Sequence, residues 1–221
     1  MTRAFLSLLL SGMLVTGLAQ AQGFKFSEAE QAVKTEQADQ QAARDAKVQA
    51  LLATPCRERI KNQKIVVLIG EERNGLVQAV QSRFGPHFEA VNSRLRELGL
   101  KTYTQAQIRA QVAQAEIDAF FKNDPDAALS ASRRLAAQYI LRGLISTQAS
   151  RNAVVNLNQV RVSMDFTLTG ANGRMISQAN VENASYASAD TSGMALTLIR
   201  ERAEELVAQL YSDYCQKAAS R

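Results

Sequence analysis

The sequence contains few of the side chains that catalytic and metal sites need. Its 221 residues include one histidine and two cysteines. A nucleophilic site of the Ser-His-Asp or Cys-His kind would have to use His87, which follows Gly85 and Pro86 and is typical of a surface or helix-cap position. No pair of histidines or cysteines has the spacing of zinc ligands. We therefore predict no catalytic residue and no metal ligand.

Three further absences limit the ligands and partners. Residues 70–75 contain two glycines, but neither the Lys-Ser/Thr of a phosphate loop nor the GxGxxG pattern of a dinucleotide site. Asp124 and Asp126 lack the acidic ladder and the glutamate of a calcium loop, and they are typical of a helix cap. The net charge of +5 comes from interspersed charges of both signs, without the basic stripe of a nucleic-acid-binding protein. We predict no cofactor and no nucleic-acid partner.

The first 21 residues have the pattern of a secretory signal peptide. Arg3 supplies the positive charge, residues 4–18 form a short apolar stretch, and Ala19 to Ala21 form a small-x-small cleavage site. An uncleaved anchor helix is the alternative, but the apolar stretch is shorter than the about 20 residues of a membrane span. No cysteine follows Ala21 to carry a lipid, and no later stretch is apolar enough for a span. We expect cleavage after Ala21 and a soluble, periplasmic product.

Export bears on the two cysteines, Cys56 and Cys215. In an exported chain such a pair favours an intramolecular disulfide. Closing a loop of this size would stabilise the fold by about 4–5 kcal/mol in the chain-entropy model. Two free thiols, or a bond between two chains, are the alternatives.

Residues 22–55 form a polar segment that is rich in Gln, Ala and Glu and has few apolar residues. Such a segment can be helical but has little apolar surface to bury. We interpret it as a solvated helical or partly disordered arm, with a partner-binding arm as the alternative. Residues 56–215 are predicted to form one domain, and residues 216–221 a short tail.

The hydrophobic period changes repeatedly within residues 56–215. Residues 64–70 are a short apolar run rich in β-branched side chains, typical of a buried strand. A helical stripe runs from Leu76 to Leu98 and is interrupted at Gly85 and Pro86. The remaining elements are expected in this order: a strand at 100–103, helices at 104–122 and 125–137, strands at 139–145, 154–168 (with a bulge near Asn158) and 174–186, and a helix at 190–215. This order predicts an α/β fold, with a mixed sheet of about five strands and helices packed on its faces.

Residues 135–145, Leu-Ala-Ala-Gln-Tyr-Ile-Leu-Arg-Gly-Leu-Ile, resemble the LGADYVLxGxI segment of a family of periplasmic α/β domains. The family comprises the curli secretion protein CsgG, the penicillin-binding-protein activator LpoB and the amino-terminal domain of TolB. The strand at 64–68, the hairpin turn before Ser177 and the closing helix are similar as well. Ala136 stands where the family often has Gly, and Gln138 where it often has Asp. The likeness covers about residues 63–212 and describes a fold more than a site.

The resemblance implies an accessory role in envelope assembly: secretion, surface-fibre or flagellar assembly, or control of a wall synthase. The sequence lacks the lipid-modified cysteine of the family's lipoproteins, the long membrane hairpins of its channel-forming members and the propeller of TolB. We therefore expect a free-standing, non-enzymatic interaction protein with an envelope protein as its partner; the sequence does not give the oligomeric state. Arg133, Arg134 and Tyr139 are candidate contact residues.

Two other functions are alternatives. The first is a domain that binds a small ligand with the loops after Gly70 and Gly143, because open α/β sheets bind ligands beyond the carboxyl ends of their strands. The second is a hydrolase of wall or polysaccharide substrates that uses Glu71, Glu72 or Asp165. Asp165 falls on the polar face of a predicted strand, where it would simply face water.

Overall fold

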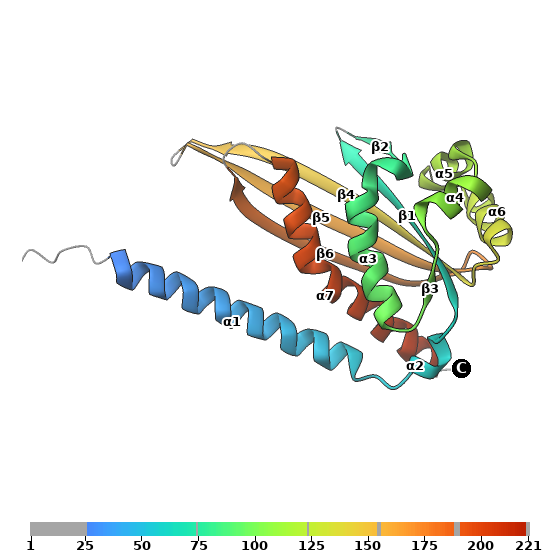
Figure 1. Cartoon of the computed structure of the whole chain (residues 1–221), viewed down its shortest axis with the longest axis horizontal. Coiled ribbons are helices and arrows are strands. Elements are labelled where there is room, and N and C mark those ends of the chain that lie inside the picture. The colour runs from blue at the N-terminus through green and yellow to red at the C-terminus, as the bar shows by residue number, and fades with distance from the viewer. Residues whose placement is uncertain (1–25, 74, 123, 154–155, 188–190, 220–221) are drawn as a thin grey trace, which may run out of the picture. The chain divides into compact units, whose positions relative to one another are not determined.

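Figure 1 shows the protein as a computed structural model. The structure describes residues 26–219 except 74, 123, 154–155 and 188–190. The predicted signal peptide 1–21, its cleavage site Ala21 and the start of the predicted arm lie outside the described residues. The chain divides into two compact units, residues 1–40 and residues 41–221, and the sheet belongs to the second.

The second unit is built on a six-stranded mixed sheet, which confirms the predicted fold class. β1 runs parallel to β3 and β4, whereas the pairs β1–β2, β4–β5 and β5–β6 are antiparallel. A parallel pair needs a long crossover, which the helices between β1 and β4 supply. The strands follow one another across the sheet as β2 (Leu76–Gln78), β1 (Lys64–Arg73), β4 (Tyr139–Asn152), β5 (Leu157–Gly170) and β6 (Met175–Ala187). β3 (Lys101–Thr102) pairs with the start of β1, at the opposite end of that strand from β2.

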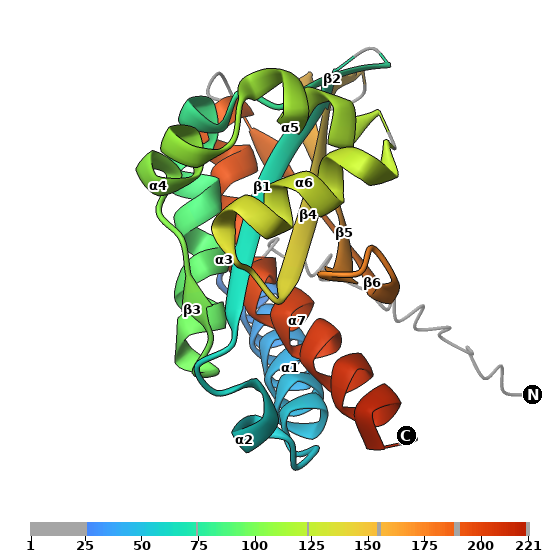
Figure 2. The ribbon, with the colours of Figure 1, turned by 90° about the vertical axis from the view of Figure 1, so that its right-hand side faces the viewer.

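Helices cover the two faces of the sheet unequally. α3 (Gly85–Glu97), which follows the 3-10 turn η1 (Gln81–Phe84), packs with α7 (Thr191–Ala219) on one face, here called the inner face (Figure 1). On the outer face, the helices α5 (Gln114–Phe121) and α6 (Pro125–Leu135) lie over β1 and β4, and α4 (Gln105–Gln111) lies to their side (Figure 2). Further along the outer face, side chains of β5 and β6 such as Arg161, Gln178 and Glu182 are exposed.

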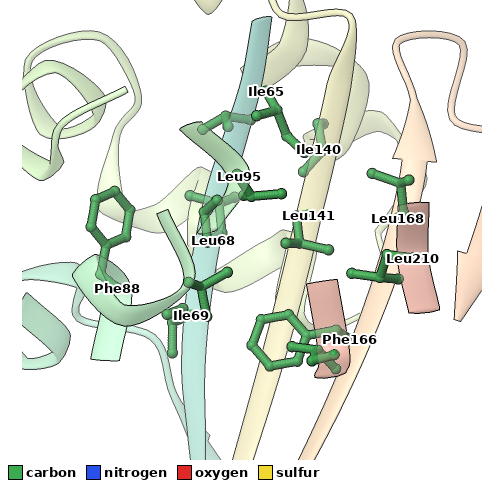
Figure 3. Packing of buried hydrophobic residues seen from close by; sticks show 14 of the residues in the cluster. Ile65, Leu68, Ile69, Phe88, Leu95, Ile140, Leu141, Phe166, Leu168 and Leu210 are labelled. Atoms are coloured by element: carbon green, nitrogen blue, oxygen red, sulfur yellow. The ribbon is translucent and has the colours of Figure 1, made fainter. Parts of the chain in front are cut away.

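The main core lies between the inner face and the helices α3 and α7 (Figure 3). Ile69 of β1 and Phe166 of β5 share one buried cluster with Leu95 of α3 and Leu210 of α7. Burying one such side chain stabilises the fold by about 1.5–3 kcal/mol. Gly143 allows the Phe166 ring to lie on β4, because a Cβ at position 143 would come within 2.3 Å of that ring.

Arg142 of β4 contacts the end of α5 on the outer face. Its guanidinium donates a hydrogen bond to the Phe121 carbonyl at 3.0 Å and lies 5.2 Å from the centroid of the Phe121 ring. Desolvation lowers the pKa of Arg142. A cation over an aromatic face is attracted by the ring quadrupole, so Arg142 holds the end of α5 against the sheet.

The described part of the predicted arm is a single helix, α1 (Phe26–Leu52). Residues 41–52 of this helix belong to the second unit. There Val48 is buried, and Lys47 Nζ lies 2.7 Å from Oε1 of Glu205 on α7. The last turns of α1 are therefore held on α7 by an apolar contact and a partly buried ion pair.

Cys56 and Cys215 are joined by the disulfide that the sequence favours, across a separation of 159 residues. Cys56 precedes the short helix α2 (Arg57–Ile60), and Cys215 lies near the end of α7. The Tyr211 hydroxyl accepts a hydrogen bond from the Cys56 N–H and donates one to the Thr54 carbonyl. The bond and this tyrosine together tie the start of the domain to its last helix.

The region after β1 differs from its predicted helix. Leu76 and Val77 belong to β2, because they pair with Arg73 and Glu72 of β1 in an antiparallel hairpin. The helical stripe begins only after this hairpin, with η1 and α3 abutting at Gly85 as the Gly-Pro interruption predicted. Leu76 and Val80 are four residues apart, as on one face of a helix, but this spacing alone does not distinguish a helix from a short exposed strand.

Three other boundaries also differ. The helix predicted over 104–122 is two helices, because the chain is extended at Val112 and Ala113. β4 continues to Asn152, because β5 pairs with it residue by residue as far as Leu157. That unbroken register excludes the bulge predicted near Asn158; the irregularity lies between Leu168 and Thr169. α7 extends through residues 216–219, which were expected to form a tail.

Candidate partner-binding edge of the sheet

The two sides of the sheet end differently. Beyond β1 lie two short strands, β2 and β3, whereas the other side ends with the 13-residue strand β6. Among the described strands β6 pairs with β5 alone. An edge strand presents unpaired N–H and C=O groups that can pair with another extended chain.

Hydrogen bonds at the two ends of β6 show which residues face outward. The Ala184 N–H donates to the side-chain oxygen of Asn183 at 2.9 Å instead of to β5. The Ile176 carbonyl accepts a hydrogen bond from Nζ of Lys217 on α7. In an antiparallel ladder, alternate residues direct both backbone groups away from the partner strand. Gln178, Asn180 and Glu182 have the same phase as Ala184, so their backbone groups also face outward.

These three residues form what we call the open edge. Across the described part of the chain, no side chain bonds the backbone of Gln178, Asn180 or Glu182, in contrast to Ile176 and Ala184. The open edge spans about 13 Å at the rise of a strand. Native proteins commonly protect sheet edges, and here only the two ends of β6 are protected in this way.

β6 is anchored on both faces, so the open edge has a defined geometry. On the outer face, Asn180 Nδ2 donates to Asp165 Oδ1 at 2.6 Å. On the inner face, Ser177 Oγ donates to Asp213 Oδ2 at 2.5 Å, and the Asn183 side chain donates to Oε2 of a glutamate on α7 at 3.1 Å. Because β6 is already held in place, this protein loses little conformational entropy when a partner binds the edge.

The two inner-face hydrogen bonds are spaced about equally on β6 and on α7. Ser177 and Asn183 are six residues apart on β6, about 20 Å. Their partners Asp213 and Glu201 are twelve residues apart on α7, about 18 Å. α7 therefore follows β6 along its length in the opposite direction and supports the strand from the inner face.

The contact residues predicted from the sequence lie elsewhere. Arg133 and Arg134 are exposed near the end of α6, and Arg134 Nε lies 3.7 Å from Glu116 Oε2. Tyr139 is half-buried at the start of β4, where its hydroxyl is 2.9 Å from that of Tyr214. Desolvation and this hydrogen bond raise the pKa of Tyr139 well above its ordinary value. Tyr139 is therefore an inward-facing core residue, whereas the two arginines are available on the surface.

The three carboxylates of the hydrolase alternative do not meet. Glu71 and Glu72 are neighbours on β1, so their side chains point to opposite faces of the sheet. Asp165 is on the outer face of β5, and β4 lies between it and Glu72, a lateral separation of about 10 Å. No common site is formed by this set.

His87 lies against an aromatic ring, and Asp124 caps a helix. His87 lies edge-on to Phe84 with 6.2 Å between ring centroids. Burial lowers its pKa; Glu71 acts in the opposite sense and Arg200 in the same sense. Asp124 is the N-cap of α6 and accepts the Asp126 N–H at 3.0 Å, as predicted. Within the described ranges, no group of three metal-ligating side chains occurs.

The loops expected after Gly70 and Gly143 are not loops. Both glycines lie inside strands, which continue to Arg73 and Asn152. Each is a glycine because an aromatic ring lies on it; a Cβ at position 70 would come within 2.7 Å of Phe121. The small-ligand alternative therefore loses the binding loops on which it was based.

The molecule also contains a small internal cavity and a surface groove. A cavity of about 30 Å³ with an apolar lining lies between α3, α7 and the sheet, and holds no more than about one water-sized molecule. A polar groove of about 340 Å³ lies between α3 and α4. Its arginines, Arg96 and Arg109, stand on exposed helix positions, and Arg96 already pairs with Glu89. Neither space has the apolar body with converging polar groups that is typical of a ligand pocket.

The sequence pattern does not reveal the open edge. The alternation of residues 174–186 predicts a strand, but a strand signal is the same at an edge as in the second-last position. The polar residues on the outer face, Gln178, Asn180 and Glu182, indicate only that this face is solvated. Which strand ends the sheet is decided by pairing between segments far apart in the chain.

No family model matches the chain, and no curated protein matches it. The solved structures to which it is similar include a lipoprotein of Neisseria meningitidis, with 13% sequence identity over 66% of this chain and 98% of that chain, at a TM-score of 0.46. Another is the PelC dodecamer of Paraburkholderia phytofirmans, with 17% identity over 68% and 87% of the two chains, at 0.40. The LpoB C-terminal domain of Salmonella enterica has 14% identity over 59% and 93%, at 0.39.

LpoB is one of the proteins that residues 135–145 resemble, and it is among these structural neighbours. In the described part of the chain, no helix has both the length and the apolar character of a bilayer span.

Proposed function

We propose that this chain is an exported, non-enzymatic accessory protein of the cell envelope, and that it binds a partner protein by strand addition at β6. The open edge carries the proposal, because three consecutive outward-facing residues, Gln178, Asn180 and Glu182, lack the protection that Ile176 and Ala184 have. Strand addition draws affinity from main-chain hydrogen bonds. The signal-peptide pattern and the Cys56–Cys215 bond support an oxidising envelope compartment.

Two substitutions at one position test the mode of binding. Asn180→Pro removes an outward N–H that takes no part in the β5–β6 ladder, and proline is tolerated at such edge positions. Asn180→Ala is the matched control, since it removes the side-chain bond to Asp165 but keeps the backbone N–H. We expect both variants to fold, with similar circular-dichroism melting curves.

The binding assay uses immobilised mature protein and envelope extract of the source organism, with quantitative mass spectrometry. An envelope protein recovered by the wild type and by Asn180→Ala should be lost with Asn180→Pro. Recovery of the same partner in equal yield by Asn180→Pro would contradict strand addition at the open edge.

The absence of enzymatic activity is tested separately with purified murein sacculi. The turbidity of the suspension should fall no faster with the mature protein than with buffer. Clearing that is abolished by Glu72→Gln or Asp165→Asn, each in a variant that stays folded, would replace this proposal with a hydrolase.

A further inference from the structure

Exposed carboxylates flank the open edge on both faces of the sheet. Glu182 extends from β6 on the outer face, where Asp165 lies one strand further in. Glu201 of α7 is exposed on the inner face beside Asn183. A strand added to β6 would lie about 4.8 Å away and direct alternate side chains to these two faces. Each of its faces would therefore meet a carboxylate.

Among the described residues, none of these three carboxylates has an ion-pair partner within 4.0 Å. Asp165 is hydrogen-bonded to Asn180, and Glu201 to Asn183, which are neutral amides. Arg161 is the nearest cation on the outer face of β5, opposite Ala184. In the described part of the molecule, neither Arg161 nor Glu182 has an ion-pair partner within 4.0 Å.

The other end of β6 differs. Asp213 also bonds a neutral side chain, that of Ser177, but Lys217 lies one helical turn further along α7 and reaches the Ile176 carbonyl. The negative charge is therefore concentrated near Glu182 and Glu201. This local sign is opposite to the net charge of +5 of the whole chain, so attraction here is a property of the edge and not of the protein as a whole.

We propose that the open edge binds a basic extended segment, with lysine or arginine at two adjacent positions opposite Glu182 and Glu201. Adjacent residues of a strand point to opposite faces, so one basic side chain would meet Glu182 and the next would meet Glu201. Opposite charges across a strand pair favour such a register. A second copy of this chain is disfavoured, because β6 itself offers no pair of adjacent basic residues. This inference rests on the proposed strand addition and adds the chemistry of the partner.

The test uses three fluorescein-labelled, amidated peptides of the same length. The basic probe is Thr-Val-Lys-Lys-Val-Thr-Val, and its matched controls carry Gln-Gln or Glu-Glu in place of Lys-Lys. Fluorescence anisotropy with the mature protein at 50 mM salt should give the tightest binding for the basic probe. The Glu-Glu probe should bind at least about tenfold more weakly, because two attractions become two repulsions. Raising the salt to 500 mM should reduce the difference.

Protein variants then locate the interaction. Glu182→Gln and Glu201→Gln should each weaken the basic probe by about two- to five-fold. Glu97→Gln, which removes an exposed carboxylate from α3 on the β1 side of the sheet, should leave its affinity unchanged. Asn180→Pro should abolish binding, and Asn180→Ala should retain it.

Three results would overturn the inference. The first is equal affinity for the basic and acidic probes, and the second is no binding of any probe at 1 mM protein. The third is a dimer in sedimentation velocity that Asn180→Pro dissociates, since the edge would then hold a second copy. In the first two cases, loss of the extract partner with Asn180→Pro would still support strand addition, so the two proposals fail separately.

Discussion

β1 and β6 belong to one sheet but have opposite surroundings. β1 pairs with β4 on one side and, near its two ends, with β3 and β2 on the other; helices cover both of its faces, and its residues 65–70 are all buried. Among the described elements, β6 has one neighbouring strand and one supporting helix, and alternate residues such as Ala179 and Val181 are buried. Between β3 and β2, the Gln81 side chain accepts a hydrogen bond from the Ile69 N–H and donates one to the Ile69 carbonyl, so a buried side chain takes the place of a strand there. At β6, by contrast, no described side chain bonds the outward main-chain groups of Gln178, Asn180 and Glu182.

The disulfide gives the largest expected effect, because it ties α7, which supports β6, to the start of the domain. Replacing Cys56 and Cys215 together by serine should lower the free energy of unfolding by about 5 kcal/mol in the chain-entropy model. Urea unfolding measures this loss. Hydrogen exchange should then accelerate more in β6 than in β1; equal acceleration in both strands would mean that α7 does not support β6 separately.

A pair of substitutions compares the two strands directly. Leu68→Ala empties a fully buried position of β1 and should lower the free energy of unfolding by about 2–5 kcal/mol. Gln178→Ala changes an exposed side chain of β6 and should stay within about 0.5 kcal/mol of the wild type. Chemical denaturation of both variants measures the contrast. A loss with Gln178→Ala as large as with Leu68→Ala would show that the outer face of β6 is covered in solution.

The smallest expected effect is the change in the free energy of unfolding when His87, on the covered inner face, becomes protonated. Burial lowers the pKa of His87 below its ordinary 6.5, so the unfolded chain binds a proton more readily than the folded one. The contribution of His87 to the free energy of unfolding should therefore be constant above about pH 6.5 and should fall as the pH drops below it. Denaturation at pH 7.5 and pH 5.5 should show a smaller fall for His87→Gln than for the wild type. An equal fall in both would assign the acid sensitivity to other groups.

The covered part of the sheet was well predicted. Residues 64–70 are apolar without alternation, because both faces of β1 are buried, and such a run indicates a central strand directly. The cap at Asp124 and the start of α6 at Pro125 follow from local chemistry that acts within one turn. These signals are strong because each depends on neighbours in the sequence.

Strand pairing between distant or neighbouring segments explains why the end of β4 and the strand β2 were predicted wrongly. The last seven residues of β4, from Ser146, are mostly polar, and only the matching strand β5 makes them a strand. Leu76 fits a helical stripe in the sequence, but the hairpin with Arg73 takes it into β2, where it is 70% exposed. A period in the sequence cannot reveal a partner that lies elsewhere in the chain.

Ala136 has a backbone conformation that usually requires glycine. It ends α6 in the left-handed conformation, with φ of 48°, where glycine is the usual residue. The resemblance placed a glycine at this position in the related domains. The chain here keeps the conformation with an alanine, at the steric cost that a Cβ carries in this region.

The sequence by itself determined the strand and helix types in the core, the N-cap of α6, and the expectation of an exported, cross-linked domain. Tertiary structure decided which strand ends the sheet, how far β4 and β5 extend, and that Glu182 and Glu201 stand on the two sides of one edge. The physical reason is the distance along the chain over which each interaction acts. Propensity, capping and hydrophobic period act within about one turn or a few residues, whereas an edge exists only once distant strands have paired and one of them is left without a neighbour.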